Sequence, residues 1–372
     1  VARPSERSWT DGGLGKTRFG DGGTTAGCVQ AGLVGTWQIT PALRALADVQ
    51  YATPAHDAWS LLEAYLRYRP VSTTPLRWSL KLGAFFPPVS LENEAIGWTS
   101  PWTLTPSAID SWVGEELRSI GAEAQLEWRG GGYTLAGVAA VLRSNDPAGE
   151  LIAARGWSLS DLTSGLGSAV REPDVYALGN QESVPLRFNP FLENDARAGW
   201  YAGASWQAPG RGRIELLRYD NDADPATHSG GVSPVFSWHT QFWNLGGELD
   251  AGGFVLLAQA MRGSTRIAPA PDFSTSTDFD AAYVLAGRTF GAWRAALRID
   301  AFATSQQPPS LADRVREHGG AATFALSWRP FEWLRLTGEC LHVRSWRNQR
   351  VEEGLAAQQD DSQLQLSARV LF

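Results

Sequence analysis

The feature that most constrains this chain is a two-residue alternation of apolar and polar side chains that returns in segment after segment. Residues 76–86 show it plainly, because Leu76, Trp78 and Leu80 alternate there with Arg77 and Ser79. Successive side chains of an extended strand point to opposite faces. Each such segment therefore predicts a β-strand with one apolar face and one polar face.

The alternation is repeated along almost the whole chain, in segments that pair naturally as hairpins. Short turns separate some of these segments, and longer connections separate the others. The two longest connections are residues 87–116 and 144–198. The pattern predicts an all-β, antiparallel fold with fifteen strands, at residues 26–39, 43–52, 58–69, 76–86, 118–129, 133–143, 199–207, 212–219, 236–249, 254–264, 279–290, 292–303, 321–329, 333–344 and 362–372.

Composition favours strands that cross a membrane. No apolar run is long enough for a transmembrane helix. In alternating strands each apolar residue is followed by a polar one, which lowers the mean hydropathy of the segment. A mean hydropathy of -0.21 is therefore compatible with a lipid-embedded barrel. The formal charge is -7, and Lys16 and Lys81 are the only lysines. An acidic chain without a basic cluster makes nucleic acid an unexpected partner.

The last segment, residues 362–372, reads SQLQLSARVLF and ends on the apolar phase at Phe372. In this it resembles bacterial outer-membrane β-barrel proteins, whose closing strand ends in Phe. The resemblance implies a place in the outer membrane of a Gram-negative bacterium, in contact with membrane lipids and lipopolysaccharide. It also implies a secretory signal, which we expect to have been removed before Val1.

A barrel with both ends of the chain on the periplasmic side needs an even number of strands. Residues 14–19 (LGKTRF) supply a candidate first strand. We therefore predict about sixteen strands with short periplasmic turns and long extracellular loops. Residues 1–13 form an N-terminal segment, and residues 14–372 form a single barrel.

With sixteen strands, residues 87–116 become the third external loop. In loop placement and strand number the chain then resembles the trimeric porin superfamily, in which that loop folds inward and narrows the pore. The resemblance implies a homotrimer and an acidic loop that faces a basic wall. The loop residues are Glu92, Glu94, Asp110, Glu115 and Glu116, and the wall residues are Lys16, Arg18, Arg44, Arg67, Arg77 and Lys81.

Aromatic residues and cysteines add weaker expectations. Tryptophans on the outward phase, such as Trp37 and Trp78, are typical of the aromatic belts at the two membrane interfaces. Trp98, Trp102 and Trp112 lie in the long connection and would suit stacking on sugars. Cys28 and Cys340 are predicted to lie on opposite faces, so we expect no disulfide bond between them.

Metal-binding and catalytic motifs are weak. The run Asp220–Asp224 resembles the start of a calcium loop, but Pro225 stands where such a loop needs glycine. No metal or cofactor is therefore expected. Ser237 and His239 could share a face as a catalytic pair, although an interior polar row explains them more simply. We expect no enzymatic activity.

The function that these patterns favour is passive diffusion of small polar solutes or ions through a charged constriction, as in a porin. A substrate-specific channel for sugars or organic anions is an alternative. Three further hypotheses are a barrel enzyme that hydrolyses lipids, a structural barrel plugged by residues 144–198, and a soluble Trp-rich β-protein. Residues 76–86 test whether the apolar face of the sheet points outward. A barrel in lipid places Trp78 and Leu80 outward and Arg77 and Lys81 inward, whereas a soluble β-protein would do the reverse.

Overall fold

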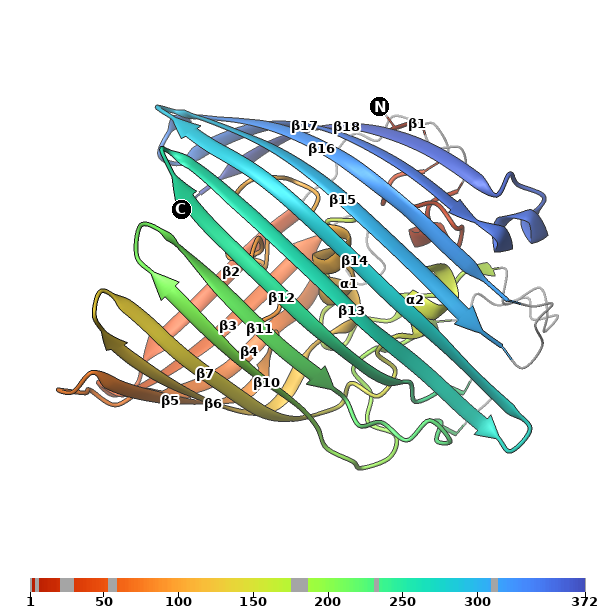
Figure 1. The fold of residues 1–372 in the computed structure, drawn as a ribbon, viewed down its shortest axis with the longest axis horizontal. Coiled ribbons are helices and arrows are strands. Elements are labelled where there is room, and N and C mark those ends of the chain that lie inside the picture. The colour runs from red at the N-terminus through yellow and green to blue at the C-terminus, as the bar shows by residue number, and fades with distance from the viewer. Residues whose placement is uncertain are drawn as a thin grey trace.

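A large antiparallel sheet forms the protein (Figure 1). The computed structural model describes residues 2–3, 7–20, 30–52, 59–174, 187–230, 234–308 and 314–371. Within these residues the sheet contains the following strands: β1 (Ala2–Arg3), β2 (Gln30–Gln38), β3 (Leu43–Ala52), β4 (Trp59–Tyr68), β5 (Leu76–Phe85), β6 (Ser119–Gly130), β7 (Tyr133–Arg143), β10 (Gly199–Ala208), β11 (Gly212–Asp220), β12 (His239–Ala251), β13 (Phe254–Ala270), β14 (Phe273–Phe290), β15 (Trp293–Gln307), β16 (Arg316–Phe331), β17 (Leu334–Arg347) and β18 (Gln358–Val370).

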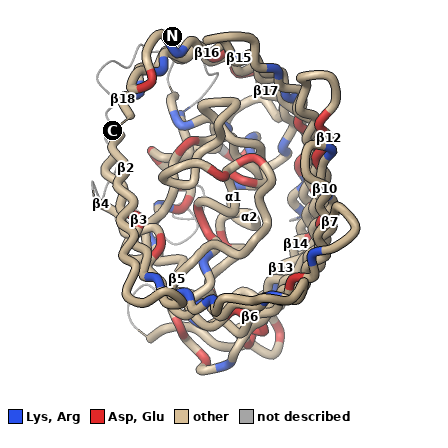
Figure 2. Tube along the Cα trace, turned by 90° about the vertical axis from the view of Figure 1, so that its left-hand side faces the viewer, with Lys and Arg blue, Asp and Glu red and all other residues tan. Residues whose placement is uncertain are grey.

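From β2 to β18, neighbours along the chain are neighbours in the sheet, with β10 next to β7, whereas β1 pairs with β18. The tiny strands β8 (Val170–Arg171) and β9 (Arg187–Phe188) form a separate pair. In Figure 2 the large sheet curves around a central group of helices and loops. Tight turns such as residues 131–132, 252–253 and 291–292 lie at one end of the sheet, here called the short-turn end, and most of the longer connections lie at the opposite end, the long-loop end.

All fifteen predicted strands are confirmed, and β3 and β7 have the predicted bounds. The late strands are longer than predicted. For example, β13 continues to Ala270 and β14 begins at Phe273, so their connection at the long-loop end is only residues 271–272. Strand pairing continues there through residues that do not follow the apolar and polar alternation, such as Thr265 with Thr277 and Arg266 with Ser276, so the pattern did not reveal it. The expected alternation of short and long connections fails at this point.

The predicted first strand at residues 14–19 is wrong. Those residues form only isolated bridges, at Gly15 and Thr17, and Leu14 and Lys16 are buried inside the sheet. The sheet instead begins with the two-residue β1, which pairs with Gln363 and Ser362 of β18. The predicted total of sixteen full strands is therefore not confirmed. No helix in the described part of the chain is long and apolar enough to span a bilayer.

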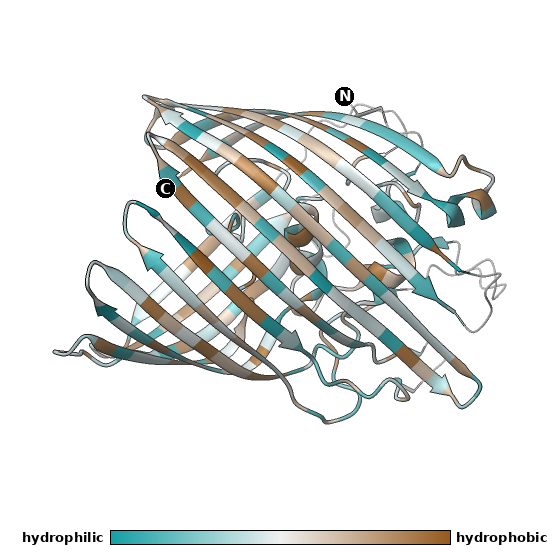
Figure 3. Cartoon of the chain, in the orientation of Figure 1, coloured by the Kyte–Doolittle hydropathy of each residue, from teal (hydrophilic) through white to brown (hydrophobic). Residues whose placement is uncertain are grey.

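The two faces of the sheet have the predicted polarity. On β5, Trp78 is 43% exposed and Leu80 48%, whereas Ser79 between them is only 6% exposed. Figure 3 shows the same alternation of hydrophobic and hydrophilic residues along the other strands. The outward face is thus apolar and the inward face is mostly polar, which is the arrangement of a barrel in lipid.

Two short helices fill part of the interior. Helix α1 (Ala108–Glu116) belongs to the connection between β5 and β6, and α2 (Glu150–Arg155) to the connection between β7 and β10. Trp112 of α1 packs against Phe242 of β12 and Phe279 of β14, with ring centroids 5.7 and 5.0 Å away. This apolar core lies inside the sheet, so the interior is not wholly wet.

Helix α1, which the sequence pattern did not predict, begins after a capping serine. Ser107 is the N-cap, and its hydroxyl accepts a hydrogen bond of 3.2 Å from the Asp110 backbone N–H. Every residue of α1 is buried. The free cysteine Cys340 is exposed, and Cys28 lies outside the described residues.

Candidate functional site

The connection that carries α1 is anchored to the late wall, which we define as strands β12–β18. Arg298 of β15 is fully buried and donates to Asp300 at 2.8 Å, to Glu92 at 3.3 Å and to the Thr105 carbonyl at 2.8 Å. Glu339 of β17 accepts from the Thr105 N–H at 3.0 Å. A guanidinium with this many partners holds its segment in one position.

Helices α1 and α2 are held together by a second charged group. Arg155 of α2 forms an ion pair with Glu115 of α1, and the Ser158 hydroxyl donates to Glu115 at 3.1 Å. Glu116 accepts from the Leu151 N–H at 2.8 Å and from the indole N–H of Trp112. Burial raises the pKa of Glu116 to about 7, although both hydrogen bonds act in the opposite direction.

The five predicted loop carboxylates do not share one environment. Glu92, Asp110, Glu115 and Glu116 are buried. Glu92 contacts Arg298 of the late wall, Glu115 and Glu116 contact α2, and Asp110 contacts Ser107 of its own connection. Burial, and then the neighbouring Glu92, raise the pKa of Asp110. Glu94 alone keeps an exposed carboxylate, 56% accessible, and it pairs with Arg213 of β11 at 2.5 Å. The expected arrangement of an acidic loop opposite the early basic wall is therefore not found for the four buried residues.

Four predicted basic wall residues do lie on the inward face of the early wall, which we define as strands β2–β7. Arg44, Arg67 and Lys81 are direct cross-strand neighbours on β3, β4 and β5. Lys81 pairs with Glu123 of β6 at 2.9 Å, and Arg67 donates to Gln125 at 3.1 Å. The fourth residue, Arg77, stands opposite Glu127.

The other two predicted wall residues are elsewhere. Lys16 lies inside the sheet in residues 7–20, called the N-terminal segment from here on, and its ammonium contacts Glu317 of β16 at 2.8 Å. Arg347 of β17 contacts the same carboxylate at 3.0 Å. Arg18 pairs with Asp161 at 3.1 Å. These residues failed the prediction because they belong to no strand, so the alternation used to place them did not apply.

A cavity of about 250 Å³ remains between the inserted connection and the early strands. Its lining includes Pro88 from the inserted connection. The polar residues around it come from β4, β5, β6, β10 and β11, and they are Arg67, Lys81, Glu123, Gln125, Ser205 and Glu215. Glu123, Gln125, Ser205 and Glu215 were not among the predicted site residues, although each sits on the polar phase of a predicted strand.

Two atoms at this cavity are enclosed without a hydrogen-bond partner in the described part of the protein. They are Nε of Arg67, a donor, and Oε1 of Glu215, an acceptor. Enclosed polar atoms of this kind are costly unless a polar guest satisfies them. The cavity is therefore suited to water or to a small polar solute.

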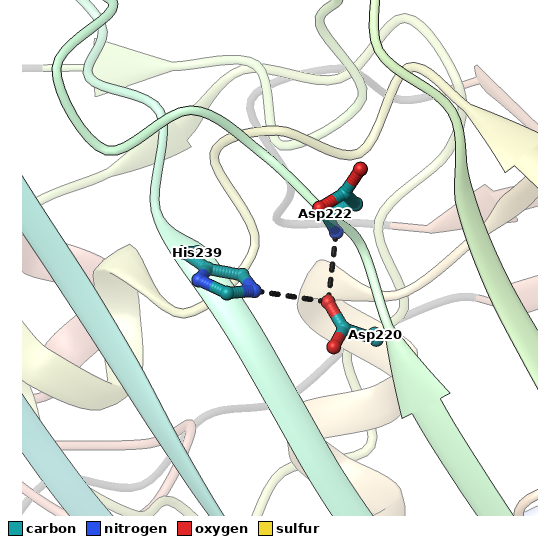
Figure 4. A group of neighbouring side chains, drawn as sticks. All are labelled: Asp220, Asp222 and His239. Carbon is teal, nitrogen blue, oxygen red and sulfur yellow. Dashed lines mark hydrogen bonds and ion pairs between the residues drawn. The ribbon is translucent and has the colours of Figure 1, made fainter.

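Near the long-loop end, Asp220, Asp222 and His239 form a compact group (Figure 4). Asp220 accepts from His239 at 3.0 Å and from the Asp222 N–H at 2.9 Å, and Asp222 pairs with Arg197 at 3.0 Å. The two hydrogen bonds to Asp220 account for the closeness of the three side chains without a bound metal ion. Ser237 instead contacts Asn194, so it does not pair with His239. His239 also falls on the phase of the exposed Trp243, not in an interior row.

No protein-family model matches the chain, and no curated protein matches it in sequence. Among solved structures, the outer membrane channel DcaP of Acinetobacter baumannii aligns with 92% of this chain and 84% of its own, at 11% identity and a TM-score of 0.49. OmpT, an outer membrane protein of Vibrio cholerae, aligns with 93% and 90%, at 10% identity and a TM-score of 0.48. OmpF of Salmonella typhi aligns with 91% and 89%, at 11% identity and a TM-score of 0.42.

These likenesses are distant, and the structure's own geometry defines the class. Antiparallel strands in chain order carry apolar residues outward and polar residues inward. The connection after β5 folds into the interior as α1. The fold is thus an outer-membrane β-barrel fold of the porin type.

Proposed function

We propose that this protein is a channel in the outer membrane of a Gram-negative bacterium that lets small polar solutes or ions diffuse through a charged constriction. The short-turn end faces the periplasm, and lipids and lipopolysaccharide surround the apolar outward face. The proposal rests on the cavity beside the early wall. This cavity is a polar space that the inserted segments do not fill. Homotrimer formation belongs to the same proposal and rests on the porin-like fold.

The passage in this proposal runs along the early wall and not through the centre. Arg44, Arg67, Arg77 and Lys81 line one side of it, and Glu94, Glu123 and Glu215 supply the negative charge. Charges of opposite sign across a narrow, partly desolvated space interact more strongly than in bulk water and orient a polar solute. The buried carboxylates Glu92, Asp110, Glu115 and Glu116 act as anchors of the inserted segment and stay outside the solute path.

Planar-bilayer recording with the full chain tests the channel. We expect discrete current steps, and a reversal potential that shifts toward cations in the double variant Arg67→Gln, Lys81→Gln. The matched control is Arg344→Gln, which removes an exposed arginine at the long-loop end of β17 that pairs with Asp360. Absence of steps in protein that shows heat-modifiable migration would refute the channel.

A plugged structural barrel is the second candidate, and a specific observation favours it. Trp9, Lys16 and Leu151 are almost completely buried, so the N-terminal segment and α2 close much of the interior. This candidate predicts no current steps in the native protein. It predicts that steps arise when the Lys16 contact with Glu317 is broken, which the same recording detects.

A further inference from the structure

Four arginines gather at the short-turn end of the late wall, apart from the cavity described above. Arg294 of β15, Arg335 of β17 and Arg369 of β18 are half-buried on the inward phase, and Arg329 lies beside the turn after β16. Arg335 stands directly opposite Arg369 in the sheet. Arg329 and Arg335 are near enough to Arg294 for their charges to act on it.

None of these four guanidiniums pairs with a carboxylate in the described part of the chain. Arg294 donates to the Pro101 carbonyl at 2.7 Å, and Arg369 donates to the Thr99 hydroxyl at 3.2 Å. Glu339, the next inward carboxylate along β17, already accepts from the backbone of Leu104 and Thr105. This contrasts with Arg298 and Arg347 of the same wall, whose charges are neutralised. Like charges held together in a partly desolvated site attract an anion.

Hydroxyl groups complete the lining of this site. Ser327, Thr337 and Ser367 stand in register across β16, β17 and β18, next to Arg335 and Arg369. The partly open hollow that they line, together with residues 100–104, has a volume of only about 10 Å³. The indole of Trp102 lies 4.7 Å from the Arg294 guanidinium and limits how far that side chain can turn. Guanidinium and hydroxyl donors around a small space suit a compact oxyanion.

We propose that Arg294, Arg335 and Arg369, with the hydroxyls of Thr337 and Ser367, bind a small oxyanion of the phosphate type at the short-turn mouth of the barrel. The anion lies at the open side of the hollow, which Arg335 and Arg369 line. The source is an anion dissolved in the lumen, because the donors face inward, away from lipid. The proposal concerns a binding equilibrium, so it does not depend on conduction.

Isothermal titration of inorganic phosphate into the full, detergent-folded chain at constant ionic strength tests this site. We expect saturable binding that weakens at least about tenfold in Arg335→Gln and again in Arg335→Gln, Arg369→Gln, as the loss of charge-assisted hydrogen bonds predicts. Ser367→Ala removes a donor but no charge, and it should weaken binding about threefold. It also keeps the test informative if the double variant does not fold. Arg344→Gln, on the same strand but outside the cluster, is the matched control and should bind as the native chain does.

Three outcomes would overturn the proposal. The first is native protein without saturable phosphate binding, and the second is equal affinity in the native, Arg335→Gln and Ser367→Ala proteins. The third concerns the source of the anion: binding to phosphatidylglycerol in mixed micelles, with none to free phosphate, would assign the cluster to a lipid headgroup. Conductance enters none of these readouts, so failure of this site and failure of the channel are separate results.

Discussion

The early and late walls of the barrel both carry charged side chains on their inward faces. The two sets of side chains differ in burial and in pairing. On the late wall, Arg298 is fully buried and bonded to the inserted segment, and Glu317 is enclosed by Lys16 and Arg347. On the early wall, Arg67 and Lys81 keep partial exposure and border a cavity. The difference comes from what covers each wall, since α1 and α2 pack against β14 and β15.

This comparison teaches that an inward arginine in a barrel has no fixed role. A guanidinium that an inserted segment buries completely, as Arg298 is buried, must be paired or hydrogen-bonded, because an isolated buried charge is very costly. Its function is then structural. A guanidinium that faces a hydrated space can remain partly unpaired and act on a passing solute. The predictions below test whether the two walls are separated in this way.

The largest effect is expected at the late wall, from Arg298→Met. Removing this cation leaves Glu92 and Asp300 buried without their partner, and breaking a buried pair in this way costs about 3–5 kcal/mol. We expect the connection that carries α1 to detach and to become sensitive to protease. Limited proteolysis and the urea midpoint of unfolding measure this change. If Arg298→Met leaves both unchanged, the late wall is not an anchor.

A pH dependence should arise from the inserted helix. Burial raises the pKa of Glu116 from 4.5 to about 7, so the folded protein holds its proton more tightly than the unfolded chain does. Stability is therefore highest below about pH 4.5 and falls as the pH rises through about 7, by roughly 3 kcal/mol for this group. Urea unfolding at pH 5 and pH 8 measures the slope. Glu116→Gln should flatten it, and Glu94→Gln, at the exposed carboxylate of the same connection, should not.

A smaller effect is expected for Lys16→Met, because Arg347 still neutralises Glu317 after the change. The loss of the buried contact should cost about 1–3 kcal/mol. We expect the N-terminal segment to become accessible to protease while the sheet keeps its heat-modifiable migration. An increase in open-channel current would show that this segment narrows the path. Uncleaved N-terminal residues in the variant would contradict its role as a tether.

The sequence predicts the wall of this barrel far better than its contents. Alternation is local and reports the face of each residue, so β3, Trp78 and the inward phase of Arg67 could all be predicted. The partners of Lys16, Glu92 and Glu115 depend on how two long connections fold inside the barrel. Those contacts join residues far apart in the chain, such as Lys16 and Glu317, and no local period encodes them. The alternation predicts that Glu215 faces inward, but only the structure shows that it lines the cavity.

The smallest effect on stability is expected at the early wall, from Arg67→Gln. This side chain keeps a partner in Gln125 and faces a cavity, so its loss should change the free energy of unfolding by no more than about 1 kcal/mol. The expected consequence is functional: because a positive charge leaves the passage, the reversal potential in a salt gradient should move toward that of a cation-preferring channel. A loss of stability as large as that of Arg298→Met would show that the early-wall arginine is a structural anchor as well, and would contradict the proposed difference between the walls. A stable variant with unchanged ion preference would place the solute path away from Arg67.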